Sequence, residues 1–179
     1  GQLRLLFNAA GILRTGAFVD IELEQHTRLV QINVLGVLNL CHAAFAYLKA
    51  TPGAQVINMG SASALYGVPQ LASYSASKFA VRGLTEALEL EWREYGIRVG
   101  DLMPPFVDTP MVRSQAQRPA VMLRLGVRLE AEQIAAAAWK QAHASAVHRP
   151  VGLQFGVLFN LGQITPGWIN RLLMAWLSR

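Results

Sequence analysis

A tyrosine and a lysine one helical turn apart are the residues of this chain best suited to acid–base chemistry. Tyr74 and Lys78 stand at positions i and i+4 of a predicted helix, so their side chains share one of its faces. A cation near the phenol favours the phenolate and lowers the pKa of tyrosine from its reference value near ~10. Ser61 follows a predicted strand and can hold the same oxygen from the other side. This pattern predicts a general acid and base that acts on an alcohol or a carbonyl.

The elements that must position these residues are apolar strands alternating with long helices. Ligands of open parallel α/β sheets bind beyond the carboxyl ends of the strands, and Ser61 lies at such an end. The alternation predicts an α/β fold with a doubly wound parallel sheet of the Rossmann kind, in a single domain over residues 1–179. The predicted strands are Leu3–Phe7, Gln55–Met59 and Ile97–Met103, and the predicted helices run from Asp20 to about Thr51 and from about Ala72 to Tyr95.

Tyr74-Ser-Ala-Ser-Lys78, with Ser61 thirteen positions before the tyrosine, resembles the active-site segment of the short-chain dehydrogenase/reductase family. Asn33 precedes Ser61 by 28 positions and resembles the asparagine that this family places at a helix kink, on a proton path to the lysine. The resemblance implies that Asn33, Ser61, Tyr74 and Lys78 are catalytic in an oxidoreductase. Such an enzyme interconverts an alcohol and a ketone or aldehyde, with NAD or NADP as cofactor.

Three alternatives accompany these assignments. A Tyr-x-x-x-Lys pair also occurs by chance on amphipathic helices, where the lysine is solvated and the tyrosine half-buried. Ser63 lies in the same small-residue loop as Ser61 and competes with it for the hydroxyl role. Asn33 interrupts an apolar stripe and could simply be satisfied by neighbouring backbone groups.

Two further segments resemble cofactor-binding motifs of the same family. Asn8-Ala-Ala-Gly11 follows a strand, as the family's Asn-Asn-Ala-Gly motif does, with Ala9 in place of the second asparagine. The run from Pro104 to Thr109 resembles the family's Pro-Gly-x-Val-x-Thr segment, but Pro105 occupies the glycine position and removes an amide donor. A tight turn and a strand terminator are the alternatives. The resemblance implies these cofactor-binding residues: Asn8, Ala10, Gly11, Tyr74, Lys78, Pro104, Val107 and Thr109.

The C-terminal third is expected to shape the substrate site. Residues 112–128 match the position of the family's mobile substrate lid and would line it with apolar side chains. A helix is predicted from Glu130 to about Ala146, and the apolar stretch His148–Phe159 indicates a last strand or a hydrophobic surface loop. Residues 166–179 form a predicted amphipathic helix. Its apolar stripe suits either a packing face or peripheral contact with a membrane.

Composition excludes several classes of protein. Of the 179 residues, 53% are hydrophobic and 15% are charged, which is typical of a globular domain and not of a disordered chain. Cys41 is the single cysteine, and the four histidines form no ligand-spaced cluster, so no disulfide framework and no metal site are expected. No secretory signal and no apolar run of ~20 residues are recognised, so a cytoplasmic, possibly membrane-associated protein is expected.

The net charge of +5 comes from the C-terminal part of the chain. Residues 112–179 contain eight Arg or Lys against two Glu, spread among apolar residues without a dense basic cluster. Nucleic acid is therefore not an expected partner. The expected partners are a small-molecule alcohol or carbonyl, lipophilic if the lid is apolar, and a second copy of the chain. The two long helices resemble the pair through which family members form homodimers or homotetramers.

One part of the family pattern has no counterpart here. The family begins with a strand, a glycine-rich turn and a helix that cradle the cofactor pyrophosphate. No such segment precedes Asn8, so roughly 60 to 90 residues of the nucleotide-binding half are expected outside this chain. The strand that normally discriminates NAD from NADP belongs to that half. Without it, the alternative is a non-catalytic binding or membrane-associated protein that keeps the fold.

Overall fold

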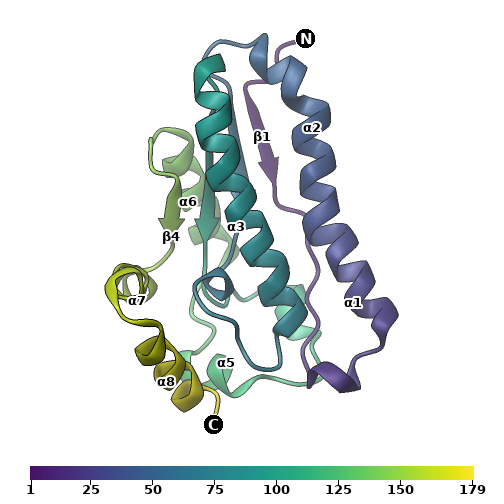
Figure 1. The fold of residues 1–179 in the computed structure, drawn as a ribbon, viewed down its shortest axis with the longest axis vertical. Coiled ribbons are helices and arrows are strands. Elements are labelled where there is room, and N and C mark those ends of the chain that lie inside the picture. Colours follow the sequence, from purple (N-terminus) through teal and green to yellow (C-terminus); the bar gives the residue numbers. More distant parts are fainter.

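Four parallel strands form the central sheet of the computed structural model, which describes residues 1–179 (Figure 1). They lie side by side in chain order, and every neighbouring pair is parallel. This confirms the predicted α/β fold with a parallel sheet, and the three predicted strands have ends shifted by at most two residues. The strands are β1 (Leu5–Asn8), β2 (Gln55–Met59), β3 (Arg98–Met103) and β4 (His148–Pro150).

Long helices cover one face of the sheet. Val56 of β2 and Val99 of β3 are register partners and point to this face, where they join a buried cluster with Val37, Leu48 and Val81 of the helices. The first predicted helix is continuous except for one wider, π-helical turn around Asn33. The helical segments are α1 (Leu23–Val30), the π-helical turn Gln31–Leu35, α2 (Gly36–Lys49) and α3 (Ala72–Trp92), with short 3-10 turns at Phe18–Asp20, Ala62–Ala64 and Arg93–Tyr95.

A shorter helix, α6 (Ala131–Ala142), covers the opposite face. Strand side chains alternate between faces, so Ile57 points away from the face used by Val56. Ile57 packs with Leu102 of β3 and Ile134 of α6 in a separate buried cluster. The predicted helix from Glu130 is thus present, capped by Glu130 itself and ending earlier than expected.

The stretch His148–Phe159 differs from its expected form. Only His148–Pro150 pairs with β3, and Gly152 with a φ of +88° turns the chain into helix α7 (Leu153–Ile164). Phe155 and Phe159, one helical turn apart, are buried and drive this helix against the end of the sheet. The predicted final helix is confirmed as α8 (Gly167–Leu177). The predicted lid holds two short helices, α4 (Pro110–Arg113) and α5 (Ala120–Leu125).

The helical segment Leu23–Lys49 also corrects an expectation. Its 27 residues include an 18-residue window with a mean hydropathy of 1.6, and the helix is long and apolar enough to cross a bilayer by length and composition alone. No such run was predicted from the sequence. In the fold, one stripe of this segment packs into the core through Val37, Cys41 and Leu48.

Candidate active site

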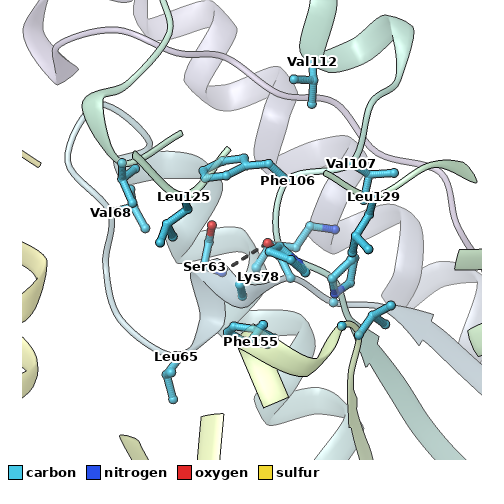
Figure 2. Close-up of a pocket in the computed structure, with 18 of the residues that line it drawn as sticks. Ser63, Leu65, Val68, Lys78, Phe106, Val107, Val112, Leu125, Leu129 and Phe155 are labelled. Carbon is cyan, nitrogen blue, oxygen red and sulfur yellow. Dashed lines mark hydrogen bonds between the residues drawn. The ribbon is translucent and has the colours of Figure 1, made fainter. Parts of the chain in front are cut away.

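A cavity of about 640 Å³ lies at the carboxyl ends of the strands and is lined by 40 residues, 27 of them hydrophobic. Seven of the predicted site residues line it, and three do not. Figure 2 shows apolar side chains such as Phe106, Leu125 and Phe155 surrounding Lys78 and Ser63. The predicted residues on the wall are Gly11, Ser61, Tyr74, Lys78, Pro104, Val107 and Thr109, whereas Asn8, Ala10 and Asn33 are not on it.

Lys78 is buried on α3 with 4% of its surface exposed. Its ammonium donates a hydrogen bond of 2.8 Å to the main-chain carbonyl of Met59, the last residue of β2. Burial lowers the pKa of Lys78 to about 8, while the negative charge of Asp101 acts in the opposite direction. The lysine can therefore gain or lose its proton near neutral pH.

Tyr74 lies one turn earlier on the same face, half-buried among Leu13, Val68 and Leu71. The Lys78 ammonium lies 5.5 Å from the centroid of its ring. Burial raises the pKa of Tyr74, and a hydrogen bond with Ser61 lowers it only in part. The predicted lowering of the Tyr74 pKa by Lys78 is therefore wrong, because desolvation of the phenolate is the larger effect.

Ser61 and Ser63 both line the cavity and both are buried. The Ser61 hydroxyl accepts a hydrogen bond of 3.1 Å from the Ser63 amide and so begins the 3-10 turn Ala62–Ala64. The Ser61 side chain is also the hydrogen-bond partner of Tyr74. This geometry favours Ser61 over Ser63 for the role beside the tyrosine.

Asn33 lies in the π-helical turn and is almost fully buried. Its side-chain oxygen accepts from the Ile12 amide at 2.8 Å, and its nitrogen donates to the Ile12 carbonyl at 2.9 Å and to the Ser77 hydroxyl at 3.2 Å. Through these bonds Asn33 connects Ile12, the residue after Gly11, to Ser77 of α3. The alternative noted for Asn33, a side chain hydrogen-bonded to neighbouring backbone groups, is thus present. Asn33 lies behind Gly11 and does not line the cavity.

Gly11 fills the space between Asn33 and Lys78. A Cβ at this position would lie 3.3 Å from Asn33 Oδ1 and 3.9 Å from Lys78 Nζ. Phe7 and Ala9 line the cavity beside it, although the sequence analysis did not select them. The available signal was that Phe7, Ala9 and Gly11 are alternate residues, because alternate residues of an extended segment point to the same side.

Asn8 points away from the cavity. Its amide nitrogen donates to Asn58 Oδ1 at 2.8 Å and contacts Cys41 Sγ at 3.4 Å, on the helix-covered face of the sheet. Burial raises the pKa of the Cys41 thiol, which suits the small buried hydrophobe expected there. The Asn8 side chain therefore links β1 to β2. Its neighbours Phe7 and Ala9 line the cavity in its place.

The segment after β3 lies along the other side of the cavity. Thr109 begins α4, and its hydroxyl accepts from the Val112 amide at 3.4 Å. Val107 forms an isolated parallel bridge with Leu129, which ties this segment to the end of the predicted lid. The C-terminal helices complete the wall with apolar residues that sequence patterns did not place there: Phe155, Leu158, Leu173, Met174 and Leu177.

The model of the family described as "short chain dehydrogenase" matches residues 1–120. The chain is 35% identical over 125 residues to a 3-ketodihydrosphingosine reductase of Bos taurus, covering 70% of this chain and 38% of the relative. It is 39% identical over 111 residues to a 3-alpha-(or 20-beta)-hydroxysteroid dehydrogenase of Mycobacterium tuberculosis, covering 62% of this chain and 43% of that relative. The chain thus spans about half the length of the curated relatives it matches, or less.

Solved structures share the fold. A short chain dehydrogenase from Burkholderia cenocepacia in complex with NADP superposes with a TM-score of 0.81 at 24% identity, covering 98% of this chain and 68% of that one. A 3-ketoacyl-(acyl-carrier-protein) reductase from Brucella melitensis complexed with NADH superposes with a TM-score of 0.72 at 25% identity, covering 84% and 66%.

Proposed function

The chain belongs to the short-chain dehydrogenase family, and from this premise we propose that it carries the catalytic half of an NAD- or NADP-dependent oxidoreductase. The reaction would interconvert an alcohol and a ketone or aldehyde. The observation that carries the proposal is the meeting of Ser61, Tyr74 and Lys78 on the wall of one largely apolar cavity. No other set of acid–base side chains gathers on that wall.

Tyr74 is the residue that would exchange the hydroxyl proton of the substrate. Its raised pKa keeps the phenol protonated at neutral pH, so it is ready to donate a proton to a carbonyl oxygen. Ser61 would hold the same substrate oxygen, and the Lys78 charge would favour the phenolate after proton transfer. Asn33 would link this group to solvent protons. Hydride transfer is the chemistry that NAD or NADP supplies when bound.

The residues at the strand ends suit a nicotinamide cofactor. Ala9 and Gly11 carry small or no side chains, and a Cβ at Gly11 would crowd both Asn33 and Lys78. Lys78 and Tyr74 would hold the ribose, and Val107 and Thr109 would bind the carboxamide. Asn8 and Ala10 would contribute through backbone position, since neither side chain lines the cavity. Solved relatives with NADP and with NADH both exist, which supports either cofactor.

The substrate would be lipophilic. Of the 40 lining residues 27 are hydrophobic, and Lys78 and Arg128 are the only charged ones. A cavity of this composition favours a ring system or chain with a single reactive oxygen. Relatives that act on hydroxysteroids, on cyclohexanol and on 3-ketodihydrosphingosine are consistent with this class.

Tyr74→Phe in the full-length protein tests the proposal. We expect kcat to fall by about 10²- to 10⁴-fold, because general acid–base catalysis contributes on that order. The Kd for NADH or NADPH, measured by tryptophan fluorescence, should stay close to the wild-type value. Tyr47→Phe, an exposed tyrosine of α2, is the matched control and should be fully active. Full activity of Tyr74→Phe would refute the assignment.

The second candidate is a non-catalytic binding protein that keeps the fold. It is favoured by Pro105, which occupies the glycine position of the family's cofactor segment and has no amide donor. Titration of the full-length protein with NADH and NADPH separates the two functions. A fluorescence change together with turnover supports the enzyme, whereas the absence of both supports the binding protein.

Peripheral membrane contact through α8 is a further part of the proposal. Trp168, Leu172 and Trp176 are exposed at helical spacing, and residues 133–179 contain no acidic side chain. An apolar stripe with neighbouring cations suits an anionic phospholipid surface. Leu177 and Met174 pack into the core cluster of the cavity, so point variants test this better than removal of residues 166–179.

The paired variant Trp168→Glu/Leu172→Glu should lose co-sedimentation with vesicles that contain anionic phospholipid. Leu23→Glu, at a leucine of α1 that is also exposed, is the control and should co-sediment like the wild type. Unchanged sedimentation of the paired variant would remove α8 as the contact. A wild-type protein that never sediments would refute the membrane contact.

A further inference from the structure

A row of polar residues crosses all four strands, from the last residue of β1 to the first residue of β4. The register pairs Asn8 with Asn58, Asn58 with Asp101, and Asp101 with His148. Paired residues of neighbouring strands point to the same face, and this face is the one covered by α2 and α3. Asn58 confirms the direction, because its amide donates to the Thr85 hydroxyl of α3 at 2.9 Å. The row therefore lies inside the protein, between the sheet and the helix that carries Tyr74 and Lys78.

The β4 end of this row is charged. His148 Nδ1 lies 3.1 Å from both carboxylate oxygens of Asp101, and His148 Nε2 lies 3.0 Å from Glu86 Oε1. Both ring nitrogens thus face carboxyl groups, and the doubly protonated imidazolium can donate to both of them. The hydrogen bond to Asp101 raises the pKa of His148, and burial raises the pKa of Asp101. Both His148 and Asp101 therefore release a proton at a higher pH than the same groups would in water.

Asp101 is fully buried next to the segment that carries the active site. A Cβ built on Gly60 would lie 3.6 Å from Asp101 Cγ, so the carboxyl group packs against the Gly60 backbone. Gly60 connects Met59, whose carbonyl accepts from Lys78, with Ser61. The carboxyl group of Asp101 thus supports the short segment on which both Lys78 and Ser61 depend.

The other charged groups near this pair balance each other. Arg82 of α3 donates to Glu86 Oε1 at 2.8 Å, and Glu86 is half exposed to solvent. From α7, the ring of Phe159 lies 6.2 Å from His148 and adds no charge. Asp101 is the fully buried carboxyl group on this face, and its negative charge favours the charged form of Lys78.

We propose that Asp101, held in place by His148, is a positioning residue that keeps the Lys78 ammonium charged and fixes the turn between Met59 and Ser61. The proposal rests on the role given to Lys78 in the proposed function. It assigns no contact with substrate or cofactor to Asp101 or His148. It adds a titratable pair on β3 and β4 to the residues that set the acid–base behaviour of the cavity.

The test is a direct titration of Lys78 in the full-length protein. Trace acetylation with acetic anhydride between pH 6 and pH 11, followed by peptide mass spectrometry, measures the neutral amine of Lys78, which lines the cavity. The wild-type midpoint is expected at about 8. Asp101→Asn should lower it by about one pH unit, because a nearby opposite charge is removed. Asp20→Asn, an exposed surface carboxylate, is the matched control and should leave the midpoint unchanged.

His148→Asn separates the effect of the imidazolium charge from the effect of its hydrogen bond to Asp101. The asparagine amide keeps a donor toward Asp101 but removes the imidazolium, so the Lys78 midpoint should not fall. Asp101→Ser, which is smaller and also neutral, replaces Asp101→Asn if that variant does not fold. An unchanged midpoint in the Asp101 variant, or an equal fall in His148→Asn, would overturn the proposal. A lowered midpoint in a protein without turnover would instead refute the proposed function and leave the Asp101–Lys78 coupling intact.

Discussion

Main-chain atoms hold the polar side chains of the site in place. Lys78 donates to the Met59 carbonyl, and Ser61 accepts from the Ser63 amide. The Asn33 side chain accepts from the Ile12 amide and donates to the Ile12 carbonyl. Each side chain is therefore only as well placed as the backbone segment it binds. Small changes in those segments should affect turnover before they affect the stability of the fold.

Gly11→Ala should reduce turnover with little loss of stability. The added Cβ would lie 3.3 Å from Asn33 Oδ1, which must move by a few tenths of an ångström and shift its neighbours. We expect kcat/KM to fall by roughly tenfold to a hundredfold, since misplacement of site groups on this scale is costly. Steady-state kinetics and thermal unfolding check both statements. Gly67→Ala, with no atom within 4 Å of its Cβ, is the control, and an equal loss there would contradict the explanation.

The free energy of unfolding should fall as the pH rises from 6 to 8. Folding raises the pKa of His148 above 6.5, so its stabilisation is complete below that pH and is lost as the pH rises through the folded value. The raised pKa of Asp101 acts with the same sign. Above pH 8 the lowered pKa of Lys78 acts in the opposite direction, because the unfolded chain then binds more protons.

Urea denaturation of wild type and His148→Asn at pH 6, 7 and 8 measures this dependence. The variant should show a flatter curve in this window, because the raised histidine pKa is absent. Parallel curves for the two proteins would show that His148 does not titrate with the fold.

Close contact between β2 and β3 determines where the cavity begins. A Cβ at Gly60 would lie 2.8 Å from the Leu102 carbonyl, which is main chain and cannot rotate away. Gly60 therefore allows the turn after β2 to stay against β3 and to present Ser61 at the sheet edge. The Asp101 carboxyl group packs against the same turn, which begins directly after Met59, whose carbonyl accepts from Lys78.

Gly60→Ala should destabilise the protein by about 1–3 kcal/mol, the usual range for overpacking a tight interior. Gly83→Ala in the middle of α3 has no atom within 4 Å of the new Cβ and should stabilise the helix by about 0.5–1 kcal/mol. Chemical denaturation gives both values. If the two alanine variants changed stability in the same direction, the close approach at Gly60 would not matter.

Two apolar surfaces of the whole molecule differ in charge. The first surface, on the outer side of the π-helical turn Gln31–Leu35, α2 and α3, exposes Leu35, Leu38, Phe79 and Leu90 and includes several glutamates on α3. The surface of α7 and α8 exposes tryptophans and leucines without any acidic residue. We assign a second copy of the chain to the first surface and an anionic lipid surface to the second, because acidic groups oppose binding to anionic lipid.

Leu90→Glu should shift the full-length protein from dimer or tetramer toward monomer. A buried, unpaired carboxylate in an apolar interface is strongly unfavourable, so the dissociation constant should rise at least tenfold. Light scattering coupled to size-exclusion chromatography measures the change. Val19→Glu, 88% exposed outside both surfaces, should leave the assembly unchanged. A protein that is monomeric before mutation would exclude this surface as the interface.

Much of the fold and the core of the site could be predicted because they depend on local periodicity. The spacing of Tyr74 and Lys78 on a helix, and of apolar residues in the three predicted strands, are properties of neighbouring residues. The family resemblance then placed Ser61 near them, and the structure shows all three on one cavity wall. Helix α7 was missed because burial of Phe155 and Phe159 against the sheet, and not their local pattern, decides its conformation.

The sequence by itself determined the parallel α/β class, and it singled out the candidate acid–base residues and their order along the chain. Tertiary structure alone decided their electrostatics. The direction of the Tyr74 pKa depends on desolvation by apolar neighbours from distant segments, and the acceptor for Lys78 is a carbonyl of another strand. The Asp101–His148 pair likewise exists only through the register of β3 and β4, which joins residues 47 positions apart. Charges act through space, so their neighbours become known only when the chain is folded.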